Sequence, residues 1–300
     1  MIAPIPVIEK LVVVGVGLIG GSFAAALRKQ KLVKQIVGVG RSQANLDQAL
    51  KLGLIDAAHT EIETAIDGAD FVFLATPVAQ MKSLLSALAP RLAAHAVITD
   101  GGSTKQDVVA YGRAALAGKF SRFVPGHPIA GTEKSGADAA DAALYEGRKV
   151  ILTPEPDTDP AAIQAVRGSW QACAAEVHLM RPAEHDAVFA AVSHLPHLLA
   201  FTLVDMMASK ENCELLFRFA AGGFRDFTRI ASSSPEMWRD ICLANRDALL
   251  AELFDYRAQL AALHESLQNA DGAQLEALFS RARTTRDEWL ARSQSPAGIE

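Results

Sequence analysis

A short apolar strand that leads into a glycine-rich turn constrains this chain more than any other feature of its sequence. Residues 11–14 read Leu-Val-Val-Val, and residues 15–20 read Gly-Val-Gly-Leu-Ile-Gly. An unbroken β-branched run is typical of a strand buried in a parallel sheet. Three alanines, residues 24–26, would let the following helix pack closely on that sheet. The sequence therefore predicts a strand, a tight turn and a helix over residues 11–29.

The same segment could instead be a signal peptide or a membrane anchor. Lys10 precedes an apolar run from Leu11 to Leu27 that only Ser22 interrupts. However, glycines punctuate this run, and it falls short of the ~20 residues that a spanning helix needs. Because the rest of the chain continues the same α/β pattern, we expect a soluble protein without a membrane partner.

Strand-like and helix-like segments alternate up to residue 181. The sequence predicts strands at residues 35–40, 71–75 and 96–100, and helices at residues 45–52, 81–88 and 105–117. Further strands are predicted at residues 123–127, 149–152 and 175–179. This alternation is typical of βαβ units, so we expect an α/β, Rossmann-like domain with a doubly wound parallel sheet.

The pattern changes after Arg181, because residues 183–292 show helical periodicity and no convincing strand. We therefore predict a dinucleotide-binding domain at residues 1–181 and an all-α domain at residues 182–300. A length of 300 residues agrees with about two domains.

Charge and cysteine content exclude some classes of protein. The net charge of −5 gives no reason to expect a nucleic-acid partner. Cys173, Cys213 and Cys242 are odd in number and widely spaced, so they provide neither a disulfide framework nor a metal site. A reducing, cytoplasmic location is expected.

The glycine-rich turn matches G-x-G-x-x-G in the strand–turn–helix context that dinucleotide binding requires. Gly15 permits the turn, Gly17 lets the backbone approach a pyrophosphate, and Gly20 allows close packing of helix and strand. Leu18 and Ile19 belong to the helix N-terminus, whose free N–H groups favour anions. The same edge of the sheet should present Thr76 and Pro77, which follow the strand at residues 71–75.

The end of the second strand bears on the choice of cofactor. It reads Gly40-Arg41-Ser42, and no carboxylate occurs before Asp47. An acidic residue there would bond the ribose of NAD, whereas a basic one accommodates the 2′-phosphate of NADP. We therefore predict a modest preference for NADP over NAD, unless Arg41 stacks on the adenine or faces water.

Two further polar segments follow predicted strands. Ser103 lies in Asp100-Gly-Gly-Ser-Thr-Lys105, and His127 lies between a glycine and a proline. A histidine near a nicotinamide can accept the proton of an alcohol while hydride leaves the same carbon. Ser103 could bond the same hydroxyl or the imidazole. On spacing alone, His127 could equally be an incidental loop histidine.

The helical half contains a histidine pair and an arginine pair. His194 and His197 lie three residues apart, so they would face the same way on a helix; we interpret them first as core histidines, then as substrate contacts, and last as metal ligands. Arg225 and Arg229 lie four apart and could bind a carboxylate, with Trp238 as an apolar wall. The alternative for the arginines is a solvated helix with surface salt bridges.

Taken together, these segments resemble the TyrA family, the prephenate, arogenate and cyclohexadienyl dehydrogenases of tyrosine biosynthesis. The glycine motif is generic to Rossmann proteins, whereas the other segments are specific. The matching segments are residues 14–22, Gly126-His-Pro-Ile-Ala-Gly-Thr-Glu133, Ser193-His-Leu-Pro-His197 and Gly223-Phe-Arg-Asp-Phe-Thr-Arg-Ile-Ala231 with Trp238. They span nearly the whole chain, so the resemblance implies the monofunctional form, without a chorismate mutase or ACT domain.

The resemblance also implies roles. His127 would be the base that polarises the ring hydroxyl, with Ser103 sharing that hydrogen bond, while hydride passes to NAD(P) and the ring carboxylate leaves as CO2. Arg229 would hold a substrate carboxylate. The same pocket would be completed by His197, Trp238, Glu133, Gly222 and Arg225, the last two from a dimer partner or an adjacent helix. No metal is implied, and the helical half would form a homodimer.

Three matters stay open at this point. No residue decides between prephenate and arogenate. A β-hydroxyacid dehydrogenase would have the same domain plan but a lysine base in the helical half, and Lys210 is the only lysine after Lys149. A dinucleotide-sensing protein without catalysis is a further alternative.

Overall fold

The structure is a computed structural model that describes residues 6–131 and 134–294. It contains two compact units, residues 1–249 and residues 250–300, which are considered separately. The glycine-rich segment at residues 11–27 is a strand and a helix of the first unit. The predicted domain boundary at Arg181 lies inside the first unit, at the beginning of a helix, and it remains a prediction.

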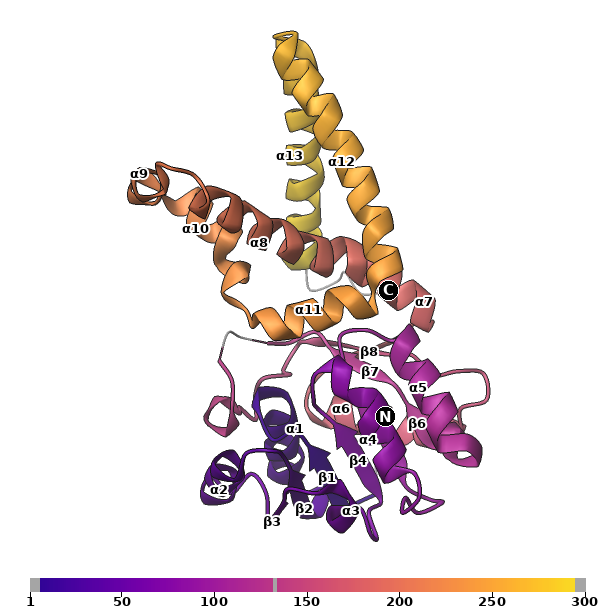
Figure 1. Ribbon diagram of the computed structural model, residues 1–300. Helices are drawn as coiled ribbons and strands as arrows, with labels where there is room; N and C mark the ends of the chain where they lie inside the picture. Colours follow the sequence, from indigo (N-terminus) through magenta and orange to yellow (C-terminus); the bar gives the residue numbers. More distant parts are fainter. Residues whose placement is uncertain (1–5, 132–133, 295–300) are drawn as a thin grey trace. The chain divides into compact units, whose positions relative to one another are not determined.

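A six-stranded parallel sheet forms the centre of the first half of the chain (Figure 1). Its strand order is β3-β2-β1-β4-β5-β6. The strands are β1 (Ile8–Val14), β2 (Val33–Val39), β3 (Ala57–His59), β4 (Phe71–Leu74), β5 (Val97–Asp100) and β6 (Phe123–Val124). Successive strands are added on one side of β1 up to β3 and on its other side from β4 onward, so the strand order reverses between β1 and β4. Ligands bind beyond the carboxyl ends of the strands at such a point.

Helices cover both faces of this sheet, as the α/β alternation predicted. They are α1 (Leu18–Lys29), α2 (Gln43–Lys51), α3 (Ile62–Ala65), α4 (Met81–Leu88), α5 (Gln106–Leu116) and α6 (Pro160–Ala172). One face buries the rings of Phe23, Phe73 and Trp170, and the ring centroids of Phe23 and Trp170 lie 4.6 Å apart. The other face buries α4 and α5 residues such as Met81, Leu85 and Val108. The apolar strands are therefore covered on both sides.

One predicted strand is wrong. Residues 123–127 form two short strands instead of one, because the chain leaves the first sheet at Pro125, which has no N–H for a ladder. The second piece, β7 (Gly126–Pro128), joins β8 (Lys149–Leu152) and β9 (Glu176–Leu179) in a three-stranded sheet. There β7 runs antiparallel to β8, so not every strand of this half is parallel.

Described residues after 181 contain helices and no strand, as predicted. In the first unit these are α7 (Pro182–Phe189), a π-helical turn (Ala190–His194), α8 (Leu195–Ala208), α9 (Cys213–Phe219), α10 (Gly222–Thr228), a 3₁₀ turn (Arg229–Ser232) and α11 (Pro235–Ala244). The second unit contains most of α12 (Arg246–Gln268) and α13 (Gly272–Gln294), which run antiparallel (Figure 1).

The continuous helical stretch from Pro182 to Ala208 is long and apolar enough to cross a membrane by length and composition alone. Its mean hydropathy is 1.7, and 28% of its most apolar window is buried. Among the polar side chains on it, His185, Asp186, His194 and His197 make hydrogen bonds inside the first unit. These polar contacts make the stretch part of the site described below.

Candidate active site

The turn between β1 and α1 has the geometry of a phosphate cradle. Gly15 has a φ of +94°, and a Cβ built on it would lie 2.4 Å from the carbonyl oxygen of Ala75. A Cβ on Gly20 would lie 2.1 Å from the carbonyl oxygen of Gly15. Both positions therefore require glycine. Gly17 caps α1 without a side-chain hydrogen bond, and its Cβ position is open, so the N–H groups of the first turn remain available to an anion.

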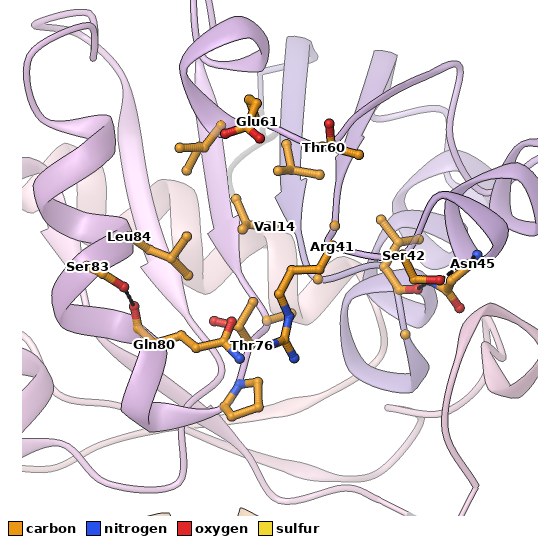
Figure 2. A pocket seen from close by; sticks show the side chains of 18 of the residues that line it. Val14, Arg41, Ser42, Asn45, Thr60, Glu61, Thr76, Gln80, Ser83 and Leu84 are labelled. Carbon is orange, nitrogen blue, oxygen red and sulfur yellow. Dashed lines mark hydrogen bonds between the residues drawn. The ribbon is translucent and has the colours of Figure 1, made fainter.

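A cavity of about 930 Å³ adjoins this turn (Figure 2). Its lining includes the predicted cofactor residues Gly15, Gly17, Arg41, Ser42, Thr76 and Pro77. Leu18, Ile19 and Gly20 form the first turn of α1 instead of the cavity wall. Thr76 Oγ1 is buried and has no hydrogen-bond partner within the described residues, so a ligand in the cavity would satisfy it. The cradle, the volume and this hydroxyl fit a dinucleotide.

Asn45, which the sequence did not single out, connects two walls of the cavity. Its Nδ2 donates to the carbonyl oxygen of Val16 at 2.7 Å, and its Oδ1 accepts from the backbone N–H of Ala137 at 2.8 Å. These bonds hold the glycine turn against the loop at residues 134–137. No sequence pattern marks this role, because both partners are backbone groups from distant segments.

The end of β2 contributes the polar part of the cavity. Ser42 caps α2, since its Oγ accepts from the backbone N–H of Asn45 at 3.3 Å. Figure 2 shows Arg41 reaching into the cavity on the side of Thr76. The acidic residues Glu61 and Glu63 also line the cavity, so its charge is mixed.

A buried ion pair holds the carboxyl end of β5 against β7. Lys105 Nζ bonds to the Asp100 carboxylate and donates to the carbonyl oxygen of Gly126 at 2.8 Å. The same carboxylate accepts the N–H groups of Gly102 at 2.8 Å and Gly126 at 3.0 Å. Ser103 lies half-buried in the loop between them, and its hydroxyl makes no hydrogen bond within the described residues. The loop of Ser103 and the strand of His127 are thereby fixed to one charged pair.

His127 is the first member of a hydrogen-bonded row of side chains. Its Nδ1 lies 2.8 Å from His185 Nε2, and His185 Nδ1 lies 2.8 Å from Asp186 Oδ1. Asp186 also accepts the backbone N–H groups of Lys105 at 2.8 Å and Gln106 at 2.9 Å, at the beginning of α5. The row therefore joins β7, α7 and α5.

The surroundings keep both histidines of this row neutral near pH 7. Burial, followed by the nearby charges of His185, Lys105 and His194, lowers the pKa of His127 well below its usual value. Burial also lowers the pKa of His185, although Asp186 opposes this. Phe189 contributes to the apolar setting, because its ring centroid lies 4.8 Å from that of His127 and 4.5 Å from that of His185. A neutral His127 can accept a proton.

A second group gathers at α8 and α11. The ring of His197 stacks on Trp238, with centroids 3.6 Å apart and an interplanar angle of 20°. His197 Nδ1 donates to the carbonyl oxygen of Ser193 at 2.8 Å, and its pKa is lowered by burial and by the charge of Arg229. Trp238 Nε1 is buried without a hydrogen-bond partner within the described residues, so it offers a donor to a ligand.

His194 and His197 differ in surroundings although they are three residues apart. His194 is buried, and its Nδ1 lies 3.1 Å from Asn245 Nδ2, which also donates to the carbonyl oxygen of Asp186 at 2.7 Å. Burial lowers the pKa of His194 to about 4. The described residues contain no group of His, Cys, Asp or Glu side chains arranged to hold a metal ion.

Some predicted substrate residues are not brought to this group. Arg225 is 83% exposed, and its Nε lies 3.9 Å from Asp226, which agrees with the surface salt bridge considered as an alternative. Gly222 begins α10 and has open space around it. Glu133 lies outside the described residues.

Sequence reasoning missed His185, Asp186 and Asn245. Only one signal pointed to the first two, which is a His-Asp pair inside an otherwise apolar helix. The contact of His185 with His127 spans 58 residues of sequence, and no local pattern encodes it.

Two family models match the chain. Residues 23–179 match the model described as prephenate dehydrogenase, nucleotide-binding domain, and residues 181–281 match prephenate dehydrogenase, dimerization domain.

Individual proteins agree with these matches. The chain is 41% identical to a prephenate dehydrogenase of Bacillus subtilis, over 93% of this chain and 76% of that protein. It is 36% identical to a cyclohexadienyl dehydrogenase of Zymomonas mobilis, over 93% of this chain and 96% of that protein. The crystal structure of prephenate dehydrogenase from Aquifex aeolicus with hydroxyphenyl propionate and NAD+ is similar at a TM-score of 0.87 and 38% identity, over 93% of this chain and 98% of that one.

Proposed function

This chain belongs to the prephenate dehydrogenase family, and on that premise we propose that it oxidises and decarboxylates prephenate, arogenate or both. The products would be 4-hydroxyphenylpyruvate from prephenate and tyrosine from arogenate. The observation that carries the proposal is a neutral, half-buried histidine, His127, whose strand is tied to the carboxyl end of β5, at the sheet edge that also carries the dinucleotide cradle. Bound NAD(P) would accept the hydride.

We assign the acid–base role to His127. As hydride leaves the ring carbon that bears the hydroxyl, His127 accepts the hydroxyl proton, with Ser103 hydrogen-bonded to the same oxygen. The ring carboxylate leaves as CO2, and the electron pair of the broken C–C bond completes the aromatic ring. The proton then returns from His127 to the phenolic oxygen. Hydride and CO2 are thus the only groups lost from the substrate, and the enzyme keeps no proton.

Binding of the anionic substrate is assigned to the group at α8 and α11. Arg229 would hold a substrate carboxylate, and the proposal rests on its charge beside His197. Trp238 would form the apolar wall. Because Arg225 is exposed in one chain, we propose that it and Gly222 act in a homodimer, and we assign Glu133 to the substrate pocket. The match of residues 181–281 to a dimerization domain supports that assembly, which we place in the cytoplasm.

For the cofactor we propose a modest preference for NADP. Arg41 and Ser42 line the cavity at the end of β2, where no carboxylate occurs. The carboxylates of Glu61 and Glu63 also line the cavity and would repel the 2′-phosphate of NADP, so the proposed preference is small. Arg41→Gln should raise the KM for NADP and leave that for NAD unchanged, whereas equal effects on both would remove Arg41 from this role.

The experiment that tests the activity supplies prephenate and arogenate separately, each with NAD and with NADP, and follows the reduced cofactor. At least one combination should give turnover, and His127→Asn should lower kcat by about 10²-fold or more. His95→Gln is the matched control, because His95 is an exposed histidine paired with Asp70. No turnover in any combination would support the dinucleotide-sensing alternative.

The β-hydroxyacid dehydrogenase alternative has weaker support. It needs a lysine base in the helical half, and Lys210 is exposed in the turn after α8. The buried lysine at the site, Lys105, is committed to Asp100 and Gly126.

A further inference from the structure

The structure holds two side chains, His185 and Asp186, for which the proposed reaction has no direct use. Both are buried, and both lie on α7, outside the dinucleotide cradle. They form a single hydrogen-bonded row with His127, in which the His127–His185 and His185–Asp186 contacts are both 2.8 Å long. Because the row ends on His127, the proposed base, its hydrogen bonds determine on which nitrogen the proton of each ring lies.

The row can be followed from its charged end. Burial alone would raise the pKa of Asp186, but hydrogen bonds from His185 and from the N–H groups of Gln106 and Lys105 outweigh it, so the pKa lies below its usual value. Asp186 is therefore an ionised acceptor. His185 must donate to it from Nδ1, and because His185 is neutral, its Nε2 carries a lone pair.

The same reasoning determines the tautomer of His127. A lone pair on His185 Nε2 requires a donor opposite, so the proton of neutral His127 lies on Nδ1. Its Nε2 then carries a lone pair, and this nitrogen makes no hydrogen bond within the part of the chain that the structure describes. The nitrogen that faces away from the row is the basic one.

We infer that His185 and Asp186 are positioning residues that hold His127 in its Nδ1–H tautomer, so that Nε2 accepts the substrate proton. When His127 takes that proton, its Nδ1–H bond to His185 spreads the new positive charge toward the Asp186 carboxylate. The proton returns to the product oxygen in the same turnover, so the row needs no exit to solvent. This inference rests on the proposed function for the identity of the proton donor, but the order of protons exists without substrate.

The contacts of Asp186 explain how the row is kept in place. Its two oxygens also cap the beginning of α5 through the N–H groups of Lys105 and Gln106. The side chain of Lys105 in turn holds the carbonyl of Gly126, the residue before His127. Both ends of the row are thereby fixed to the segment between β5 and α5.

Two substitutions test the row while its side chains stay similar in size: Asp186→Asn changes the acceptor at its end, and His185→Phe removes the acceptor for His127. In Asp186→Asn, an amide oxygen at the Oδ1 position still accepts from His185 Nδ1 and from the Lys105 N–H, whereas the Gln106 N–H loses its acceptor. The order of protons should therefore stay, while the negative charge at the end of the row is lost. In His185→Phe, the ring shape and the cap of α5 remain, but the acceptor for His127 is lost. His185→Gln restores an acceptor oxygen.

The test combines nitrogen NMR of histidine-labelled full-length protein with steady-state kinetics. In the wild type and in Asp186→Asn, His127, assigned by its loss in His127→Asn, should carry its proton on Nδ1, whereas in His185→Phe no acceptor holds the proton there. Both Asp186→Asn and His185→Phe should lower kcat by about 10²-fold or more with KM and cofactor Kd nearly unchanged, and His185→Gln should recover part of the loss. Asp67→Asn and His95→Gln, both at exposed ion pairs, serve as matched controls.

The inference is overturned if wild-type His127 carries its proton on Nε2, or if His185→Phe keeps kcat within about threefold of the wild type. Should Asp186→Asn unfold through loss of the α5 cap, His185→Phe decides, because it leaves that cap intact. If the wild type turns over neither substrate, the proposed function fails, while the NMR result still decides the order of protons.

Discussion

Lys105→Met should destabilise the first unit more than any surface substitution. Lys105 and Asp100 are both 0% exposed, so the substitution leaves a buried carboxylate without its counter-charge. Removing one partner of a buried pair typically costs about 3–5 kcal/mol. The carbonyl of Gly126 loses its hydrogen bond from Nζ as well, which places the expected loss toward the upper end of that range.

The assay is urea unfolding of Lys105→Met, with Lys34→Met as control. Lys34 pairs with Glu9 at 2.7 Å but is 63% exposed, so its loss should cost under about 1 kcal/mol. Asp100→Asn combined with Lys105→Met should recover part of the stability, since no unpaired charge remains and the amide oxygen still accepts one of the two N–H groups, that of Gly102 or that of Gly126. A loss under about 1 kcal/mol for Lys105→Met, or a double variant no more stable than the single one, would refute the reasoning.

Three further predictions concern the cradle, the substrate and pH. Gly20→Ala should raise cofactor Kd strongly, because its Cβ would meet the carbonyl oxygen of Gly15 at 2.1 Å; an unchanged Kd in fluorescence titration would contradict this. Arg229→Ala should raise the substrate KM by about tenfold or more and leave cofactor Kd unaltered, consistent with the loss of a charged hydrogen bond. Unfolding should take up a proton at His194, whose pKa of about 4 in the fold lies below 6.5, so the free energy of unfolding should fall as pH drops from about 6.5 to 4. His194→Gln should make that slope shallower in urea titrations at several pH values, and an identical slope would exclude this source.

The local elements were predictable because their causes are local. The run of β-branched residues at 11–14 and the spacing of Gly15, Gly17 and Gly20 encode a strand, a turn and a helix within twenty residues of chain. The short strand at residues 57–59 was missed, since Ala-Ala-His has little β-propensity and pairs only with the end of β2. The bend at Pro125 could have been read from the proline, yet its result, a second sheet, depends on β8 and β9.

The residues of the candidate site also divide into those that the sequence pointed to and those that depend on distant segments. The place of His127 after a predicted strand and the resemblance to the TyrA family pointed to this residue, and Ser103 follows the strand β5. Arg229 and His197 were also chosen from sequence; the charge of Arg229 lowers the pKa of His197, and a pocket that they share stays a prediction. Arg225, chosen for its spacing from Arg229, is exposed beside Asp226, and Arg229, which begins the 3₁₀ turn after α10, is exposed as well.

The sequence by itself determined the α/β alternation, the dinucleotide cradle and the residues able to carry acid–base chemistry, because each depends on neighbours a few positions away. Only the tertiary structure decided which nitrogen of His127 is basic. That choice depends on His185 and Asp186, 58 and 59 positions further along the chain, and on the N–H groups of α5 that hold the carboxylate. The ionised Asp186 determines which nitrogen of His185 donates, and His185 determines which nitrogen of His127 donates. These contacts join distant segments, so local residue spacing does not encode them.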